Sequence, residues 1–191
     1  MEDPRDAPLA PAARRPARLS AGLLALLASL AVAPPASAAE ITYATDDDAY
    51  TVGVIWINGG NLVAAVEPLE VALKMAKTDA VRVKVYRALL VPYRELPEIG
   101  PMQKASEFVM ANSDQAYERS NTRSTLLTFI RKRGKLDAAL KGYEARLDKS
   151  PDDRTALYVL AEAYATYKED PAKSADYAEK LAAVEKKQGK G

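Results

Sequence analysis

The sequence predicts an all-α protein built from four helix-turn-helix units that stack on one another. Apolar residues recur after 34 residues in the last third of the chain, each set shares one helix face, and glycine or proline separates the helical segments. A helical bundle without repeats, in which this spacing is coincidental, is the alternative. The recurring pairs are Leu126 and Leu160, Leu127 and Ala161, Ile130 and Tyr164, Tyr143 and Tyr177, and Leu147 and Leu181.

The composition excludes several classes of function. The 191 residues include no Cys and no His, and the numbers of basic and acidic residues are nearly equal, at 27 and 26. Without imidazole or thiol groups there is no His general base, no Cys nucleophile, no disulfide and none of the usual zinc ligand sets. A nucleic-acid-binding protein would show a strong basic excess, which is missing here. We expect no cofactor and no metal site.

Residues 1–38 have the pattern of an export signal. Arg14, Arg15 and Arg18 precede an apolar run at 19–33, and small residues at 36–38 end the segment. A retained membrane anchor is the alternative, but the run is short for a helix that spans a bilayer. The sequence therefore predicts an exported protein, periplasmic or secreted by the ordinary route, with no stable membrane anchor after cleavage.

Four units are expected after a short linker, and a basic tail follows them. The linker covers 39–45, the units cover 46–82, 83–119, 120–153 and 154–187, and the tail covers 188–191.

The first unit begins at the acidic triplet 46–48. We interpret the triplet as a helix cap whose charge opposes the helix dipole; a calcium loop is the alternative, but the alternating ligand spacing is missing. The turn of this unit contains Gly59 and Gly60. Its packing residues are Gly53, Trp56, Ala65 and Leu69.

The second unit departs most from the regular spacing. Its turn, at 94–101, is three residues longer than the turns of its neighbours. Pro92 here and Pro68 in the first unit fall inside predicted helices, where proline removes a backbone hydrogen bond, so we expect a kink or a different boundary at each. The packing residues are Leu89, Leu90, Tyr93 and Ala105.

The third and fourth units carry the clearest repeat. In the third, Gly134 ends the first helix in a left-handed conformation, and a second helix runs from 136 to 149 before Pro151. The small Ala139 is expected to let the two helices approach closely, while Tyr143 and Leu147 fill the space beside the neighbouring hairpin. The fourth unit has Lys168 and Lys173 in place of the turn glycine and the small alanine. The packing residues of both units are Leu126, Leu127, Ile130, Gly134, Ala139, Tyr143, Leu147, Pro151, Leu160, Ala161, Tyr164, Tyr177 and Leu181.

This pattern resembles the tetratricopeptide repeat, in which 34-residue helix-turn-helix units stack into a right-handed superhelix. The resemblance implies that the first helix of each unit lines a concave face that binds a peptide or a partner helix. Some members of the family hold a terminal carboxylate with lysines and asparagines, but Val54 and Thr125 stand at the asparagine positions here. That particular activity is not expected.

By the same resemblance, nine residues of the first helices are candidates for contact with a partner. A basic middle section, with Arg87, Arg94 and Arg131 followed by Lys132, suits carboxylates, which arginine binds through two parallel hydrogen bonds. The alternative is that these are ordinary solvated charges. The candidates are Tyr50, Lys84, Arg87, Arg94, Thr128, Arg131, Lys132, Tyr158 and Glu162.

The predicted function is a non-enzymatic interaction scaffold that binds a protein or peptide partner of unknown identity, with an acidic partner as one option. A structural role, in which the protein self-associates through Trp56 and its apolar neighbours in the first unit, is the alternative. An enzyme is disfavoured, because no carboxylate pair lies in a recognisable motif and a helical stack offers no obvious closed pocket.

Overall fold

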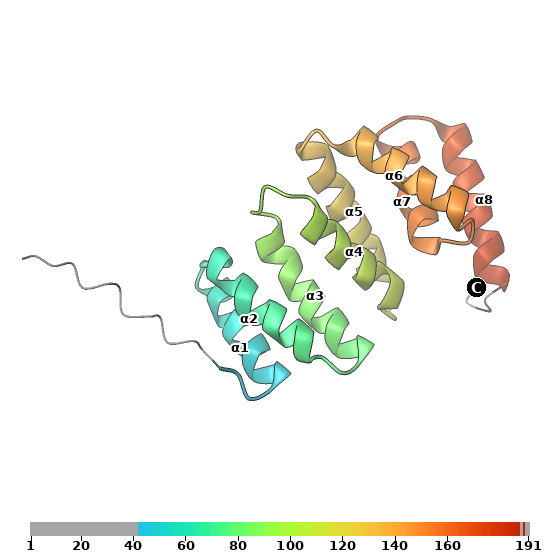
Figure 1. Ribbon diagram of the computed structural model, residues 1–191. Helices are drawn as coiled ribbons and strands as arrows, with labels where there is room; N and C mark the ends of the chain where they lie inside the picture. The colour runs from blue at the N-terminus through green and yellow to red at the C-terminus, as the bar shows by residue number, and fades with distance from the viewer. Residues whose placement is uncertain (1–41, 188, 190–191) are drawn as a thin grey trace, which may run out of the picture. The chain divides into compact units, whose positions relative to one another are not determined.

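A computed structural model describes residues 42–187 and 189, and this part of the chain contains eight α-helices and no strand. The all-α fold and its helical-repeat stack are confirmed. The predicted signal at 1–38 and residues 39–41, 188, 190 and 191 lie outside the described residues. The helices are α1 (Asp46–Asn58), α2 (Leu62–Met75), α3 (Asp79–Tyr93), α4 (Gly100–Asn112), α5 (Ala116–Lys132), α6 (Leu136–Lys149), α7 (Arg154–Thr166) and α8 (Pro171–Lys187) (Figure 1).

The stack is built from helix hairpins in sequence order. α1 packs against α2, α3 against α4, and α7 against α8, so these six helices form three close pairs. The second helix of each hairpin also contacts the first helix of the next, as α2 contacts α3 and α4 contacts α5. Figure 1 shows this progression from α1 at one end to α8 at the other.

Side-chain caps determine where several helices begin. Thr45 caps α1 in a reciprocal arrangement with Asp48, and Asp153 caps α7 through the backbone N–H of Ala156, at 2.9 Å. Thr78 caps α3 through the backbone N–H of Val81, at 3.3 Å. The predicted start of the second unit at 83 is therefore wrong, because this cap starts the helix at Asp79. The third unit likewise begins with α5 at Ala116 rather than at 120.

A glycine in the left-handed conformation forms the turn of the first and of the third hairpin. Gly60 and Gly134 have φ angles of 77° and 66°, in the left-handed region where glycine has no steric penalty. The longer turn of the second hairpin is confirmed, because α3 ends at Tyr93 and α4 begins only at Gly100. In the fourth hairpin the left-handed residue is Glu169, at φ 51°, directly after the Lys168 that replaces the expected glycine.

Both prolines lie within helices. Pro68 is buried inside α2, and Pro92 is buried near the end of α3. α3 ends one residue after Pro92, so the missing N–H of this proline costs a single hydrogen bond in the last turn of the helix.

The first hairpin is held by a very close approach of its helices. A Cβ atom added to Gly53 would lie 2.5 Å from Cγ of Leu69, so only glycine fits there. Ala65 is fully buried on the same side. Trp56, however, was predicted to pack and is 40% exposed.

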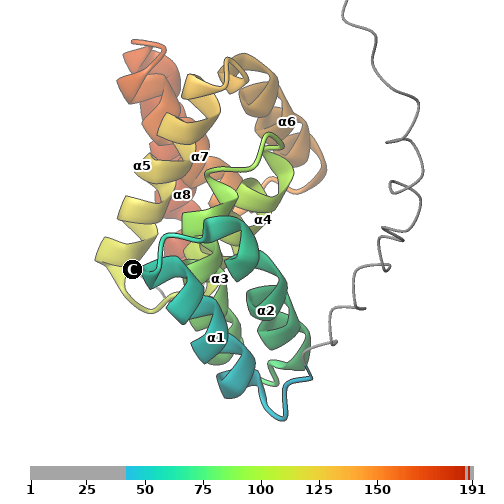
Figure 2. The ribbon, with the colours of Figure 1, turned by 90° about the vertical axis from the view of Figure 1, so that its left-hand side faces the viewer.

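The third hairpin is open. α5 and α6 contact each other at few positions, whereas α7 contacts α4, α5 and α6 (Figure 2). The expectation that Ala139 brings α5 and α6 closely together is therefore wrong, since Ala139 is only half-buried. Leu140, its neighbour on α6, is buried instead.

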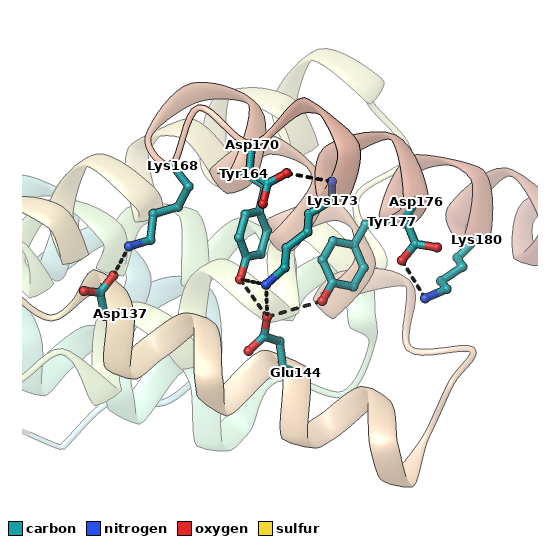
Figure 3. Close-up of polar contacts among 9 residues, drawn as sticks. All are labelled: Asp137, Glu144, Tyr164, Lys168, Asp170, Lys173, Asp176, Tyr177 and Lys180. Atoms are coloured by element: carbon teal, nitrogen blue, oxygen red, sulfur yellow. Dashed lines mark hydrogen bonds and ion pairs between the residues drawn. The ribbon is translucent and has the colours of Figure 1, made fainter.

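Polar contacts join α6 to its neighbours on both sides. The carboxylate of Glu107 on α4 accepts hydrogen bonds from the Tyr143 hydroxyl, at 2.8 Å, and pairs with Arg146, at 2.8 Å. On the other side, Glu144 accepts hydrogen bonds from the hydroxyls of Tyr164, at 2.7 Å, and Tyr177, at 3.3 Å (Figure 3). These bonds fix α6 against both the second and the fourth hairpin.

One buried cluster runs from α1 to α7, a smaller one joins α7 to α8, and most of the predicted packing residues lie in or beside them. The buried ones are Gly53, Ala65, Leu69, Leu89, Tyr93, Ala105, Leu126, Leu127, Ile130, Tyr143, Leu160, Tyr164 and Leu181. Leu90, Ala139, Leu147, Ala161 and Tyr177 are half-buried, while Trp56, Gly134 and Pro151 are exposed. The last two lie in turns, where conformation rather than burial determines their role.

Candidate functional site

A groove opens between α3 and α5. No Cα atom of α3 lies within 8 Å of a Cα atom of α5, because α5 packs against α4 instead. Two adjoining cavities of about 320 and 520 Å³ fill this space, and both are lined by Arg94 and Thr125. We call the pair of cavities the α3–α5 groove. Its first cavity also contacts Arg87, Leu90, Tyr117 and Glu118, and its second contacts Glu95, Ser124, Thr128, Phe129, Lys132 and Arg133.

The second cavity is basic. Arg94, Lys132 and Arg133 line it together with a single acid, Glu95. Within the described part of the chain, neither Arg94 nor Lys132 forms an ion pair, whereas several other basic residues do. The Arg133 guanidinium donates to the backbone oxygen of Arg94, at 3.0 Å, and thus ties the end of α5 to the end of α3. The second cavity therefore contains more basic than acidic side chains, and neither Arg94 nor Lys132 is held by a described carboxylate.

Hydroxyl groups line the α5 side of the groove. Ser124 donates to the carboxylate of Glu162 at 2.6 Å, and the hydroxyls of Thr128 and Tyr167 lie 3.1 Å apart. The Thr125 hydroxyl makes no such side-chain bond to any residue that the structure describes, and Thr125 lines both cavities. It is the hydroxyl best placed to bind a ligand alongside Arg94.

The first cavity is closed on one side by an ion pair. The Arg87 Nε atom lies 2.6 Å from Oε1 of Glu118, whose side chain is only 11% exposed. Glu118 also accepts a hydrogen bond from Ser113. Arg87 therefore lines the groove, but Glu118 neutralises its charge. The exposed aromatic ring of Tyr117, 81% accessible, lies beside this pair.

The structure does not bring all nine predicted contact residues together. Arg87, Arg94, Thr128 and Lys132 line the groove, but Arg131 does not: its guanidinium lies over the Tyr167 ring, 4.9 Å from the centroid. The remaining four lie elsewhere along the first helices, on either side of the groove.

On one side, Lys84 binds Asp47 at 3.0 Å and lies 4.0 Å from the centroid of the Tyr50 ring, which joins α3 to α1. On the other side, Glu162 pairs with Arg123 and so joins α7 to α5. Tyr158 donates a hydrogen bond to Glu185. That bond, and after it the Arg154 guanidinium, lowers the pKa of the Glu185 carboxyl.

Sequence reasoning missed several residues of the groove, among them Thr125, Tyr117 and Arg133. Thr125 was noted only because it occupies a position where a carboxylate-binding asparagine would stand, and Tyr117 and Arg133 were not considered. Arg133 follows the last residue of α5 and precedes the turn glycine. The predicted end of the helix therefore could have placed Arg133 beside the turn. Tyr117 fell outside the predicted helix because the start of that unit was placed too late.

Two further observations concern other kinds of site. Within residues 42–187 and 189, no three His, Cys, Asp or Glu side chains gather in a way that could hold a metal ion. None of the described helices combines the length and apolar character required to cross a bilayer.

Comparison with protein-family models finds no match to the chain, and none of the curated proteins matches it. The helical-repeat architecture therefore rests on the fold, and membership of the tetratricopeptide family is part of the proposal.

Proposed function

We propose that this chain is an exported, non-enzymatic interaction scaffold of tetratricopeptide type, which binds a protein or peptide partner in the cell envelope or outside the cell. The observation that carries the proposal is the α3–α5 groove, where Arg94 and Lys132 remain without a carboxylate partner in the described part of the chain.

The form of the groove favours a chain-like ligand over a small substrate. Its two cavities adjoin along α5, and most of the residues that line them are polar or charged. Small-molecule sites are usually more enclosed and more apolar. A segment that bears carboxylates complements the unneutralised cations, and arginine binds carboxylates through two parallel hydrogen bonds.

The proposal is tested by pull-down with two matched charge reversals. Lys132→Glu reverses a charge that lines the groove, whereas Arg131→Glu makes the same change at the preceding residue, which lies over Tyr167. A partner captured from envelope extract or culture medium by the unchanged protein and by Arg131→Glu, but not by Lys132→Glu, supports the proposal. Equal capture by both variants removes the groove from the function.

Arg87 is a poorer choice for this experiment. A glutamate there would stand against Glu118, which already holds Arg87 at 2.6 Å, so loss of binding would mix repulsion within the fold with loss of a ligand contact.

Exposed apolar residues in the first hairpin favour a second candidate function, self-association. Ile55, Trp56 and Val63 are 61%, 40% and 78% exposed, and they lie on both sides of the α1–α2 turn. Sedimentation of the protein and of a Trp56→Ser variant tests this candidate. A dimer that the substitution converts to monomer supports an assembly role, and a monomer at all concentrations rules out this surface as a self-association site.

A further inference from the structure

We propose that the α3–α5 groove selects an extended peptide that carries a pair of carboxylates and, a defined number of residues away, one large apolar side chain. This inference rests on the proposed function and specifies the partner's chemistry. The two cavities differ in character, since one presents cations and the other an exposed aromatic ring, and they share only Arg94 and Thr125.

The second cavity supplies a seat for carboxylates. Arg94 and Lys132 form no ion pair within the described residues, and the Thr125 hydroxyl makes no side-chain hydrogen bond there. Each of these groups can donate a hydrogen bond, whereas Ser124 and Thr128 are already bound to Glu162 and Tyr167. A carboxylate accepts hydrogen bonds through both oxygens, so a pair of carboxylates complements the two unpaired cations, and the Thr125 hydroxyl can donate to one of the pair.

The first cavity offers an apolar contact at Tyr117 and Leu90, among lining residues that are otherwise polar or charged, including Gln115, Asn121 and Thr122. Tyr117 is 81% exposed, and Leu90 is half-buried beside it in the same cavity. Apart from Arg94, which both cavities share, the cation of this cavity is Arg87, and its charge is paired with Glu118, so a carboxylate gains little at the Tyr117 end. An aromatic ring left open to solvent provides a large apolar contact at a low cost in side-chain entropy.

The distance between the seats fixes the spacing in the ligand. Tyr117, Thr125 and Lys132 lie along α5, which rises about 1.5 Å per residue, so the seats are about 12 to 22 Å apart. An extended chain covers this distance with about four to seven residues. A ligand whose acidic and apolar residues are adjacent cannot reach both seats.

The test uses the full chain and fluorescein-labelled synthetic peptides. Each peptide has two aspartates and one phenylalanine, separated by glycine-serine spacers of about one, five or ten residues, in both chain directions, and a matched set replaces the phenylalanine with serine. Fluorescence anisotropy measures the affinity at low salt and at physiological salt. Tightest binding is expected for the intermediate spacer, with a loss of about fivefold or more for the short spacer and for the serine peptides.

Paired variants assign each seat. Lys132→Glu is expected to weaken binding about tenfold or more, whereas Arg131→Glu is expected to weaken it only slightly. Tyr117→Ser should abolish the preference for phenylalanine, and Val63→Ser, at an equally exposed apolar residue of the first hairpin, should leave it intact. Far-ultraviolet circular dichroism verifies that each variant is folded.

Each outcome discriminates between the inference and the function on which it rests. An affinity that does not depend on spacer length overturns the inference. So does a preference for phenylalanine that persists in Tyr117→Ser. Either result leaves a scaffold that recognises negative charge alone. Failure of all peptides to bind, with a protein partner still captured through Lys132, overturns the inference in favour of a folded partner surface. Loss of the Lys132 dependence in the pull-down refutes the proposed function itself.

Discussion

Glu118 and Arg87 form an ion pair across the α3–α5 groove, with 2.6 Å between Oε1 and Nε. The acid is nearly buried, at 11% side-chain exposure, while the arginine is 54% exposed. Glu118 thus keeps one cation of the groove occupied from within the fold, and the groove's unneutralised cations are confined to the end that contains Arg94 and Lys132.

Removing the charge of Glu118 is expected to strengthen the binding of acidic peptides. Glu118→Gln keeps an acceptor for the Ser113 hydroxyl but releases Arg87, so the groove gains one unneutralised cation. The affinity should rise about two- to tenfold at low salt, and less at high salt, because exposed charges are screened. Anisotropy titration with the two-aspartate peptides measures the change.

The control for this prediction is Glu67→Gln, which removes the same charge on α2, outside the groove. An equal gain in both variants would show a general effect of net charge and contradict the role given to Glu118.

Substitution of Gly53 is expected to destabilise the first hairpin. In Gly53→Ala the new Cβ would meet Leu69 at 2.5 Å, so the helices must separate or Leu69 must leave its position. Overpacking of this kind costs about 1 to 3 kcal/mol, which urea unfolding measures as a lower free energy of unfolding.

Gly142→Ala is the matched control for Gly53→Ala. Gly142 lies in α6 with no atom within 4 Å of the added Cβ, so alanine should stabilise the helix by about 0.5 to 1 kcal/mol. A Gly53→Ala protein as stable as the original would show that α1 and α2 are not in this close contact in solution.

Removal of the Tyr143 hydroxyl is expected to weaken the contact between the second and third hairpins. The ring is 1% exposed and its hydroxyl donates to Glu107 at 2.8 Å, while Arg146 and Gln103 also bind this carboxylate. Since Glu107 keeps two partners in Tyr143→Phe, the free energy of unfolding should fall by only about 1 kcal/mol. Tyr117→Phe, at an exposed ring, should leave the free energy of unfolding unchanged. An equal free energy of unfolding in Tyr143→Phe and Tyr117→Phe would show that the buried hydrogen bond does not stabilise the fold.

Alkaline pH is expected to weaken the contact between α6 and α8. Burial, and after it the charge of Glu144, raises the pKa of Tyr177 from 10.0 to about 12. The folded protein therefore keeps this phenol proton at pH values where the unfolded chain has released it, so the contribution to stability falls as pH rises from 10.0 towards 12.

Tyr177→Phe isolates this effect. The unchanged protein should exceed the variant in free energy of unfolding at pH 8, and the difference should shrink at pH 11. A difference that stays constant between the two pH values would show that Tyr177 titrates alike in the folded and unfolded chain.

The elements that local sequence determines were predicted well. The second helix of the third hairpin has its predicted bounds, 136 to 149, because a glycine precedes it and Pro151 follows its end. The start of α3 was misplaced, because the cap of Thr78 was overlooked in favour of the apolar spacing further along. Local rules suffice only where every cap is recognised.

The groove was only partly predictable. The residues of the first helices could be named from their spacing, and four of the nine line the groove. The gap between α3 and α5, the neutralisation of Arg87 by Glu118 and the placement of Arg131 over Tyr167 depend on how helices from different hairpins pack. Spacing along a single helix contains no information about such distances.

The open third hairpin limits how this array can grow. Because α7 contacts α4, α5 and α6, the third hairpin completes its packing only when the fourth is present. In a regular solenoid each repeat contacts only its neighbours, so a gene duplication can insert one more copy without disturbing the others. Here a copy inserted between α6 and α7 would expose the surface that α7 covers. The last two hairpins must therefore be duplicated or transferred as one unit.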